Sequence, residues 1–118
     1  MRFLFTIYHD ERVLDALPEG EMQALVDGAL EYSDELRQSG HYIASNALQG
    51  PRTARTIRVR DGKVSTTDGP FAETKEQLGG FFLIEAKDMD EACAIASRFP
   101  PARVGTIEVR PVRELKHS

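Results

Sequence analysis

The sequence predicts a single domain of the α+β class over residues 1–118, built on an antiparallel sheet that carries helices on one face. A chain of 118 residues is long enough for one domain with its own core. The hydrophobic share of 41% and the charged share of 29% are ordinary for a globular protein. Strand-like and helix-like segments follow one another in the order β-α-β, hairpin, β-α-β.

The chain opens with a strand and then a long amphipathic helix. Residues 2–8 are rich in aromatic and branched side chains, which favour a strand. Pro18 marks the expected first position of the helix, where its missing N–H costs nothing, and Gly40 marks the C-terminal stop. Between them, side chains suited to a buried stripe recur at steps of three and four residues: Met22, Leu25, Val26, Ala29, Leu30, Ser33 and Leu36.

A second strand and a β-hairpin are expected in the middle of the chain. The strand covers residues 42–48. The pair Asp61-Gly62 signals a two-residue turn, because both central positions of such a turn need positive φ. This turn joins two expected strands, over residues 56–60 and 63–67.

A long loop then leads back into a strand and a helix. The loop covers residues 68–80, with one helical turn expected over residues 73–77, and the next strand covers residues 81–85. Asp88 is expected to cap the second helix, with Glu91 three residues later in a capping-box arrangement.

The second helix buries one stripe and ends at a proline pair. Its stripe consists of Ala92, Ile95, Ala96 and Phe99. Pro100-Pro101 ends the helix, and a final strand covers residues 106–112. Two β-α-β halves in this order predict a ferredoxin-like antiparallel sheet with both helices on one face, to which the hairpin is an insertion.

Apolar side chains emerge from both faces of two expected strands. In one strand Phe3, Phe5 and Ile7 alternate with Leu4, Thr6 and Tyr8, and in the other Phe82 and Ile84 alternate with Phe81 and Leu83. Two helices can cover only one face of the sheet, and soluble monomers rarely expose contiguous apolar patches. The sequence therefore predicts a homodimer in which two sheets pack face to face. The alternative is that the hairpin or the C-terminal tail folds over that face within one subunit.

The loop after the hairpin holds the candidate acid or base, Asp68. Near an apolar cavity the pKa of this carboxyl group would rise, and the group could exchange protons with a ligand. The alternative is that the Asp68 side chain accepts hydrogen bonds from backbone N–H groups and holds the turn. Gly69-Pro70 fixes a sharp entry to the loop, and Gly79-Gly80 allows a close backbone approach before the next strand.

The same loop carries a resemblance to a known family. The string DGPF at residues 68–71, followed by AETKE and GGFF, closely resembles the hallmark of the YCII-related domain family, DGPF branch. The resemblance extends over nearly the whole chain. Further matching segments are the opening strand through Tyr8, Glu35-Leu36-Arg37 with Gly40, residues 58–63, and Glu108-Val109-Arg110-Pro111.

The resemblance implies a ferredoxin-like fold of the dimeric α+β barrel group. Members of this branch are mostly uncharacterised, and some lie beside or are fused to sigma factors of the extracytoplasmic-function type. The wider family implies small-molecule enzymology through a histidine and an aspartate that face a cleft between sheet and helix. The aspartate corresponds to Asp68, whereas no histidine lies between Pro18 and Gly40, where the other branch has one on the first helix. Tyr32 is the nearest polar substitute on that helix.

The main functional hypothesis is a small-molecule enzyme or ligand binder with acid–base chemistry centred on Asp68. A mostly apolar pocket would be lined by Phe5, Tyr8, Tyr32 and Phe71, with Glu73 and Lys75 as further ligand-binding residues. If the protein is an enzyme, proton transfer by Asp68 suits a lyase or isomerase acting on a small organic acid or ring compound. The sequence indicates no metal or organic cofactor.

The alternative is a non-catalytic regulatory or interaction module associated with an extracytoplasmic-function sigma factor. An acidic helix face is the candidate surface, and it consists of Asp27, Glu31, Asp34 and Glu35. Such a face is more often simply solvated.

Several other classes of function are not expected. The formal net charge of −4 argues against nucleic-acid binding. The single cysteine, Cys93, forms no internal disulfide and fits a reducing, cytoplasmic location. The apolar residues 1–8 are too short to span a membrane, and no signal-peptide cleavage site follows them. The three histidines lie too far apart in sequence for metal-ligand spacing.

Three side chains outside the loop remain to be interpreted. His9 either approaches the site from the strand end or is a surface residue at the strand exit, and we favour the surface interpretation. Cys93 is expected to be a small buried thiol. Arg52 either binds an anionic ligand or is solvated, and both interpretations stay open.

Overall fold

A computed structural model describes residues 1–117 of the protein. Four strands form the main sheet: β1 (Arg2–His9), β2 (Tyr42–Ala47), β5 (Gln77–Glu85) and β6 (Gly105–Pro111). Two more form a separate hairpin: β3 (Arg55–Arg60) and β4 (Lys63–Asp68). The helices are α1 (Glu11–Asp15), α2 (Glu21–Gln38) and α3 (Met89–Ser97), with short 3₁₀ turns over Pro51–Thr53 and Pro100–Arg103.

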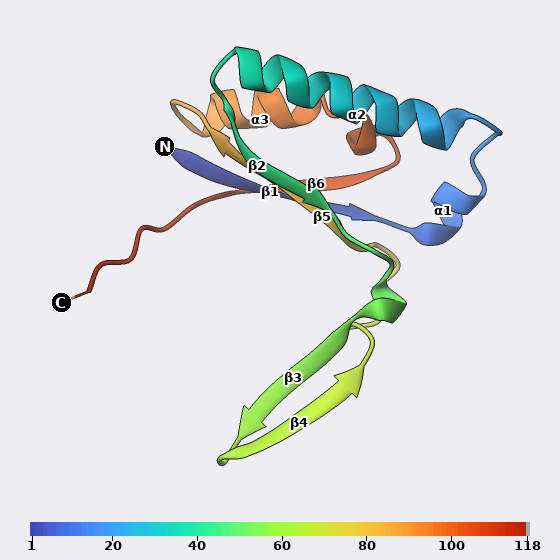
Figure 1. Cartoon of the computed structure of the whole chain (residues 1–118), viewed down its shortest axis with the longest axis vertical. Coiled ribbons are helices and arrows are strands. Elements are labelled where there is room, and N and C mark those ends of the chain that lie inside the picture. The colour runs from blue at the N-terminus through green and yellow to red at the C-terminus, as the bar shows by residue number, and fades with distance from the viewer. Residues whose placement is uncertain (118) are drawn as a thin grey trace.

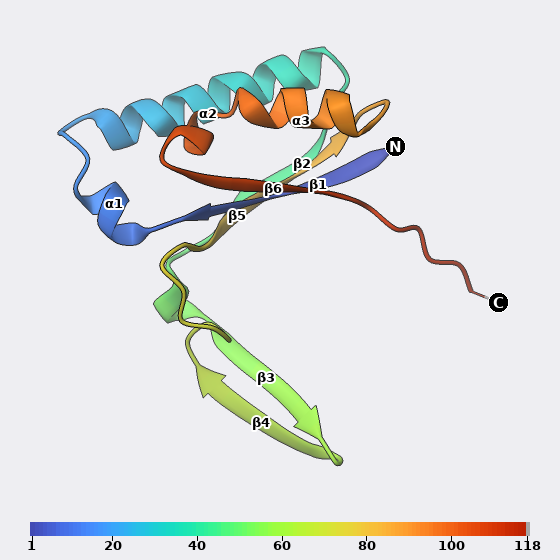
Figure 2. The same cartoon turned by 180° about the vertical axis from the view of Figure 1, so that it is seen from behind.

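The main sheet has the strand order β2-β5-β1-β6, and all neighbouring strands are antiparallel. This is the order that two interlocked β-α-β halves produce. Helices α2 and α3 lie side by side on one face of the sheet (Figures 1 and 2). The predicted ferredoxin-like α+β fold with an inserted hairpin is therefore confirmed.

The connection between β1 and α2 differs from the prediction. The short helix α1 was not expected, and it forms because the Asp10 side chain accepts a hydrogen bond from the Arg12 N–H at 2.9 Å. The prediction that Pro18 begins the long helix is wrong. Its carbonyl accepts the Glu21 N–H in a turn, and Gly20 with φ of 86° directly precedes α2.

The loop before β5 contains no helical turn over residues 73–77, so that prediction is also wrong. Instead β5 begins at Gln77, which pairs with His9 of β1. Ile7 pairs with Gly80 and Tyr8 with Leu78, which leaves Gly79 as the extra residue of a β-bulge. Pairing with β1 thus makes β5 begin earlier than predicted, at a residue where the local sequence alone favoured a helical turn.

The start of α3 follows the predicted capping pattern. The Asp88 carboxylate accepts the Glu91 N–H at 2.9 Å, and the Glu91 carboxylate accepts the Lys87 N–H at 3.1 Å. The predicted stripe is buried, as its relative exposures show: Ala92 0%, Ile95 8% and Ala96 6% in α3, and Phe99 1% just beyond the end of α3 at Ser97.

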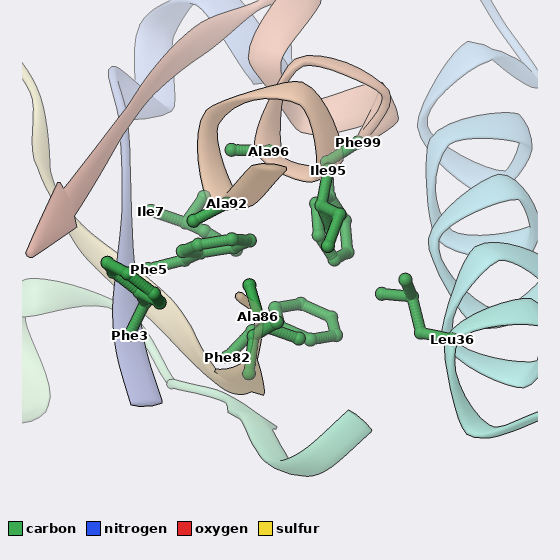
Figure 3. Packing of buried hydrophobic residues seen from close by; sticks show 11 residues of the cluster. Phe3, Phe5, Ile7, Leu36, Phe82, Ala86, Ala92, Ile95, Ala96 and Phe99 are labelled. Carbon is green, nitrogen blue, oxygen red and sulfur yellow. The ribbon is translucent and has the colours of Figure 1, made fainter. Parts of the chain in front are cut away.

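Aromatic rings from three elements meet in the core between the sheet and the helices. The ring of Phe99 packs edge-on against Phe5 at a centroid distance of 6.1 Å and against Tyr32 at 4.7 Å. It also contacts Phe82 of β5 at 4.3 Å. Figure 3 shows Phe5, Phe82 and Phe99 together with Leu36, which comes from the C-terminal half of α2.

Among residues 1–117, neither a helix nor another strand covers the opposite face of the sheet (Figures 1 and 2). Leu4, Tyr8, Phe81 and Leu83 on this face are only partly buried. The hairpin and the segment that follows β6 up to residue 117 both leave the sheet and diverge from it (Figures 1 and 2). The alternative that the hairpin or the tail shields this face within one subunit is therefore wrong. We refer to this surface as the open face.

Candidate ligand-binding site

A hollow lies between the sheet and the N-terminal half of α2. Helix α2 has 18 residues, whereas its neighbour α3 has nine, so α3 covers only part of its length. Ser33 and Leu36 in the C-terminal half of α2 are buried. Leu30, Val26 and Met22 in the N-terminal half are exposed by 62%, 39% and 47%, although they belong to the same stripe.

These exposed side chains line a cavity of about 260 Å³, which we call the apolar chamber. Its sheet side includes Ile7 and Phe82, and its helix side includes Met22, Val26 and Leu30. Such a cavity is large enough for a small organic ring.

A second cavity, of about 330 Å³, lies beyond the end of β1, and we call it the polar chamber. Its charged and amide side chains come from α1, from the loop and 3₁₀ turn after β2, and from the start of β5: Glu11, Asp15, Gln49, Arg52 and Gln77. Arg52, for which the sequence allowed either ligand binding or simple solvation, therefore lines a cavity.

His9 lines both chambers. It continues the alternation of Phe3, Phe5 and Ile7 along β1, and so it follows the face that carries the helices. His9 is partly buried, and the structure thus corrects our interpretation of it as a surface residue at the strand exit. The signal that could have found it is this period of two.

The imidazole of His9 lies directly against the backbone of Gly79. A Cβ atom added at Gly79 would lie 2.6 Å from Nδ1 of His9, a separation that real Cβ atoms do not show. A Cβ atom at Gly80 would similarly lie 2.9 Å from the Asn46 carbonyl oxygen. The close approach predicted at Gly79-Gly80 is therefore confirmed. At Gly79 the absence of a side chain leaves the space that the imidazole of His9 occupies.

We expect Gly79→Ala to destabilise the fold by about 1 kcal/mol, because the new methyl group displaces the ring of the partly buried His9 side chain. In a His9→Ala background the same change should have little effect. Urea unfolding of the two single variants and the double variant measures this coupling. Additive effects of the two changes would show that Gly79 does not position His9.

Side chains of the polar chamber are free to meet a ligand. Within residues 1–117, no hydrogen bond or ion pair with another protein group engages the side chains of His9, Glu11, Asp15 or Arg52. Arg52 can donate several hydrogen bonds, and Glu11 can only accept them when it is ionised. The chamber thus offers both signs of charge beside the imidazole of His9.

Helix α1 forms one wall of the polar chamber, and an ion pair fixes its first turn. The Arg12 guanidinium donates to Asp10 at 3.0 and 3.3 Å. This side-chain hydrogen bond, followed by the one from the Arg12 backbone, lowers the pKa of Asp10 from its ordinary value of 3.8. Lys75 also contributes a favourable charge to the Asp10 carboxylate. Glu11 and Leu14 of the same helix line the chambers.

Because the pKa of Asp10 is lower in the folded protein, its cap stabilises α1 above the unfolded pKa and is lost as the pH falls through the folded value. We therefore expect the Arg12 amide resonance to shift at a pH below 3.8. Arg12→Gln should raise the pKa of Asp10 toward its ordinary value, whereas Arg113→Gln in the tail should not. An NMR titration of both variants measures this, and an unchanged Asp10 pKa in Arg12→Gln contradicts the assignment.

A broad hollow of about 920 Å³ lies on the other side of the sheet, at the root of the hairpin. Its lining includes Tyr8, Thr56, Phe71 and Leu78. Tyr8 and Phe71, two of the predicted ligand-binding residues, therefore face the same space. Phe71 does not anchor the loop, because its side chain is 79% exposed.

The structure does not bring the predicted pocket residues together. Phe5 lies in the core and Tyr8 on the open face, because successive residues of β1 point to opposite sides of the sheet. Tyr32 also lies toward the core, where its hydroxyl donates to the Ile95 carbonyl at 2.8 Å. Burial raises the pKa of Tyr32. A single pocket lined by Phe5, Tyr8, Tyr32 and Phe71 is therefore not formed.

Asp68 lies at the end of β4 and outside all three cavities. Its side chain is 87% exposed, and Nε of Arg55 approaches its Oδ1 at 3.4 Å. The turn is held by other groups: the Gly69 N–H donates to the Ala54 carbonyl, and the Thr56 hydroxyl donates to the Gly69 carbonyl. The sequence-based alternative that the Asp68 side chain holds this turn is therefore wrong.

The remaining predicted site residues are on the surface. Glu73 and Lys75 are exposed and line none of the three cavities. Cys93 is exposed on α3, so the expectation of a buried thiol is wrong. No helix within residues 1–117 has the length and apolar character needed to cross a membrane.

Comparisons with known proteins agree with this architecture. The family model described as YCII-related domain matches residues 1–116. An uncharacterised protein of Rhizobium meliloti (strain 1021) is 33% identical over 114 residues, which cover 95% of this chain and 92% of that protein.

A solved structure with a similar fold is 5-chloro-2-hydroxyhydroquinone dehydrochlorinase from Burkholderia phenoliruptrix AC1100, in complex with 2,5-dihydroxybenzoquinone. It aligns with a TM-score of 0.51 and 18% identity, over 100% of this chain and 96% of that one. This likeness shows that the two chains share the fold.

Proposed function

The chain belongs to the YCII-related domain family, and from this premise we propose that it is a small-molecule enzyme whose ligand occupies the two chambers beneath α2. One observation carries the proposal: a histidine lies on the boundary between an apolar cavity and a polar one. Cavities with apolar walls and a few converging polar groups are the usual sites of small-molecule ligands.

The chambers favour a ring compound with polar substituents. The ring would lie against Phe82 and Val26, and its substituents would reach Arg52 and Gln77 in the polar chamber. His9 is the acid or base, since an imidazole transfers protons in either direction near neutral pH. Proton transfer next to a polarised substituent suits a lyase or an isomerase. The ligand of the dehydrochlorinase structure, 2,5-dihydroxybenzoquinone, is a compound of this class.

Titration of the protein with 2,5-dihydroxybenzoquinone tests the location of the site. We expect the amide resonances of His9, Val26 and Arg52 to shift. Ala29→Phe should weaken binding at least about tenfold, because the larger side chain fills the apolar chamber. Ala24→Phe is the matched control, because Ala24 is exposed on the same helix and does not line the chamber. Equal affinities of the two variants would place the ligand elsewhere.

We also propose that the protein is a homodimer through the open face. Leu4, Phe81 and Leu83 would be covered by the same face of a second copy, which removes apolar surface from water. Sedimentation velocity should show a dimer for the wild-type chain and a monomer for Leu83→Glu. A wild-type chain that stays monomeric at micromolar concentrations would contradict this assembly.

Asp68 stays a prediction as a second acid or base. Its side chain is 87% exposed and therefore hydrated in a single copy, so apolar surroundings for this carboxylate would require cover from a second copy. An association with a sigma factor also stays a prediction. Of its candidate surface, Asp27 accepts a hydrogen bond from Gln23, and Asp34 forms an ion pair with Arg37, which is typical of a solvated helix face.

A further inference from the structure

The hairpin of β3 and β4, which we call the arm, extends away from the rest of the chain. Its two strands form a separate sheet and pair only with each other. Figures 1 and 2 show the arm leaving the sheet on the side of the open face. The radius of gyration is 16.4 Å, whereas a compact domain of this length has about 13–14 Å. The arm is thus a projection that no other part of residues 1–117 covers.

One face of the arm is apolar and exposed. Ile57, Val59 and Val64 are exposed by 64%, 56% and 69%, and Val59 pairs directly with Val64 across the ribbon. The opposite face carries Arg58 paired with Ser65. An isolated two-stranded hairpin is only marginally stable in water. An apolar face on such a ribbon therefore indicates a surface that another molecule covers.

The charges of the arm indicate what covers it. The segment from Arg55 to Asp68 contains four basic and two acidic residues, which gives it a formal charge of +2. The whole chain has a charge of −4, so the remainder carries −6. The arm of one copy is therefore attracted to the body of another copy, and no second kind of protein is needed to supply complementary charge.

The reach of the arm fits the same occupant. Each of its strands has six residues, which span about 20 Å at 3.3 Å per residue. Stacked sheets lie about 10 Å apart. The arm leaves the chain on the side of the open face. If a second copy stacks its sheet on that face, the arm is long enough to extend past this second sheet and to reach the helices behind it.

We propose that the arm is an intersubunit clasp, whose apolar face of Ile57, Val59 and Val64 packs on the body of a second copy of this chain. This inference rests on the homodimer proposed above and adds a second contact to it. The same contact would cover Asp68, which shares the apolar face of the ribbon through the alternation of β4.

A pair of glutamine variants on the two faces of the arm tests the clasp and leaves the charge of the arm unchanged. Val59→Gln places a polar side chain in the apolar face and should raise the dimer dissociation constant at least about tenfold. Ser65→Gln adds the same side chain to the opposite face of the same ribbon and should change it less than about twofold. Analytical ultracentrifugation of the full chain measures both. Equal dissociation constants for the two variants overturn the clasp.

Amide hydrogen exchange of residues 55–68 provides a second measurement. We expect these amides to become protected when the concentration of the purified chain rises through the dimer dissociation constant, and to lose this protection in Leu83→Glu. A dimer whose arm amides exchange equally fast at every concentration overturns the clasp and leaves the open-face dimer intact. A wild-type chain that is monomeric overturns both the open-face dimer and the clasp. The location of the ligand site is tested separately by the titration with 2,5-dihydroxybenzoquinone.

Discussion

Phe99→Ala should lower the free energy of unfolding by about 3–5 kcal/mol, the largest effect on stability that we expect from one substitution. The side chain is only 1% exposed, and its ring contacts Phe5, Tyr32 and Phe82 at once. Truncation removes this burial and leaves a cavity between α2, α3 and the sheet. Urea unfolding monitored by circular dichroism measures the change.

Phe71→Ala is the matched control for this experiment, because it removes the same atoms from a side chain that is 79% exposed. We expect it to change the free energy of unfolding by less than about 1 kcal/mol. If both substitutions destabilise the protein equally, the core does not lie where Phe99 meets the aromatic rings of the sheet.

His9→Asn should reduce turnover of an identified substrate by about 10²–10⁴-fold, because it removes the proposed acid or base while keeping a polar side chain in the site. The loss should appear mainly in kcat, and the limb of the pH profile that belongs to the histidine should disappear. Asparagine retains hydrogen-bonding capacity, so ligand affinity should change much less than the rate.

His117→Asn provides the control, since His117 is an exposed residue of the tail. Asp68→Asn in the same assay separates the two candidate acids or bases. A variant of Asp68 that keeps full turnover removes this carboxyl group from the chemistry. A variant of His9 that keeps full turnover with an unchanged pH profile would instead rule out the imidazole.

The candidate site could be predicted only in part. A pocket between sheet and helix was implied by the family resemblance, and the predicted stripe of α2 contains six of its lining residues: Met22, Leu25, Val26, Ala29, Leu30 and Ser33. His9 was interpreted as a surface residue because the predicted strand ended at Tyr8. The period of two along β1 already places it on the face of Phe3, Phe5 and Ile7. Its close contact with Gly79 depends in addition on the pairing with Gln77 and on the bulge in β5, which are not local.

Phe5 and Tyr8 illustrate a different difficulty. Both are aromatic and close in sequence, and the composition of the strand alone makes both suitable for one pocket. The pleat places them on opposite faces of the sheet. A consistent use of the period of two would have separated them.

The sequence by itself determined which segments form strands, the two main helices, the cap at Asp88 and the turn at Asp61-Gly62, where φ is 52° and 75°. The helices, the cap and the turn depend on interactions between residues no more than four positions apart, and the strands are indicated by their local composition, so the local pattern is sufficient to locate them. The start of β5 at Gln77 was decided by its pairing with β1. Only the tertiary structure decided that half of the α2 stripe stays uncovered and that the arm stands away from the body. These features depend on the unequal lengths of α2 and α3 and on pairing between distant strands, which a local pattern does not contain.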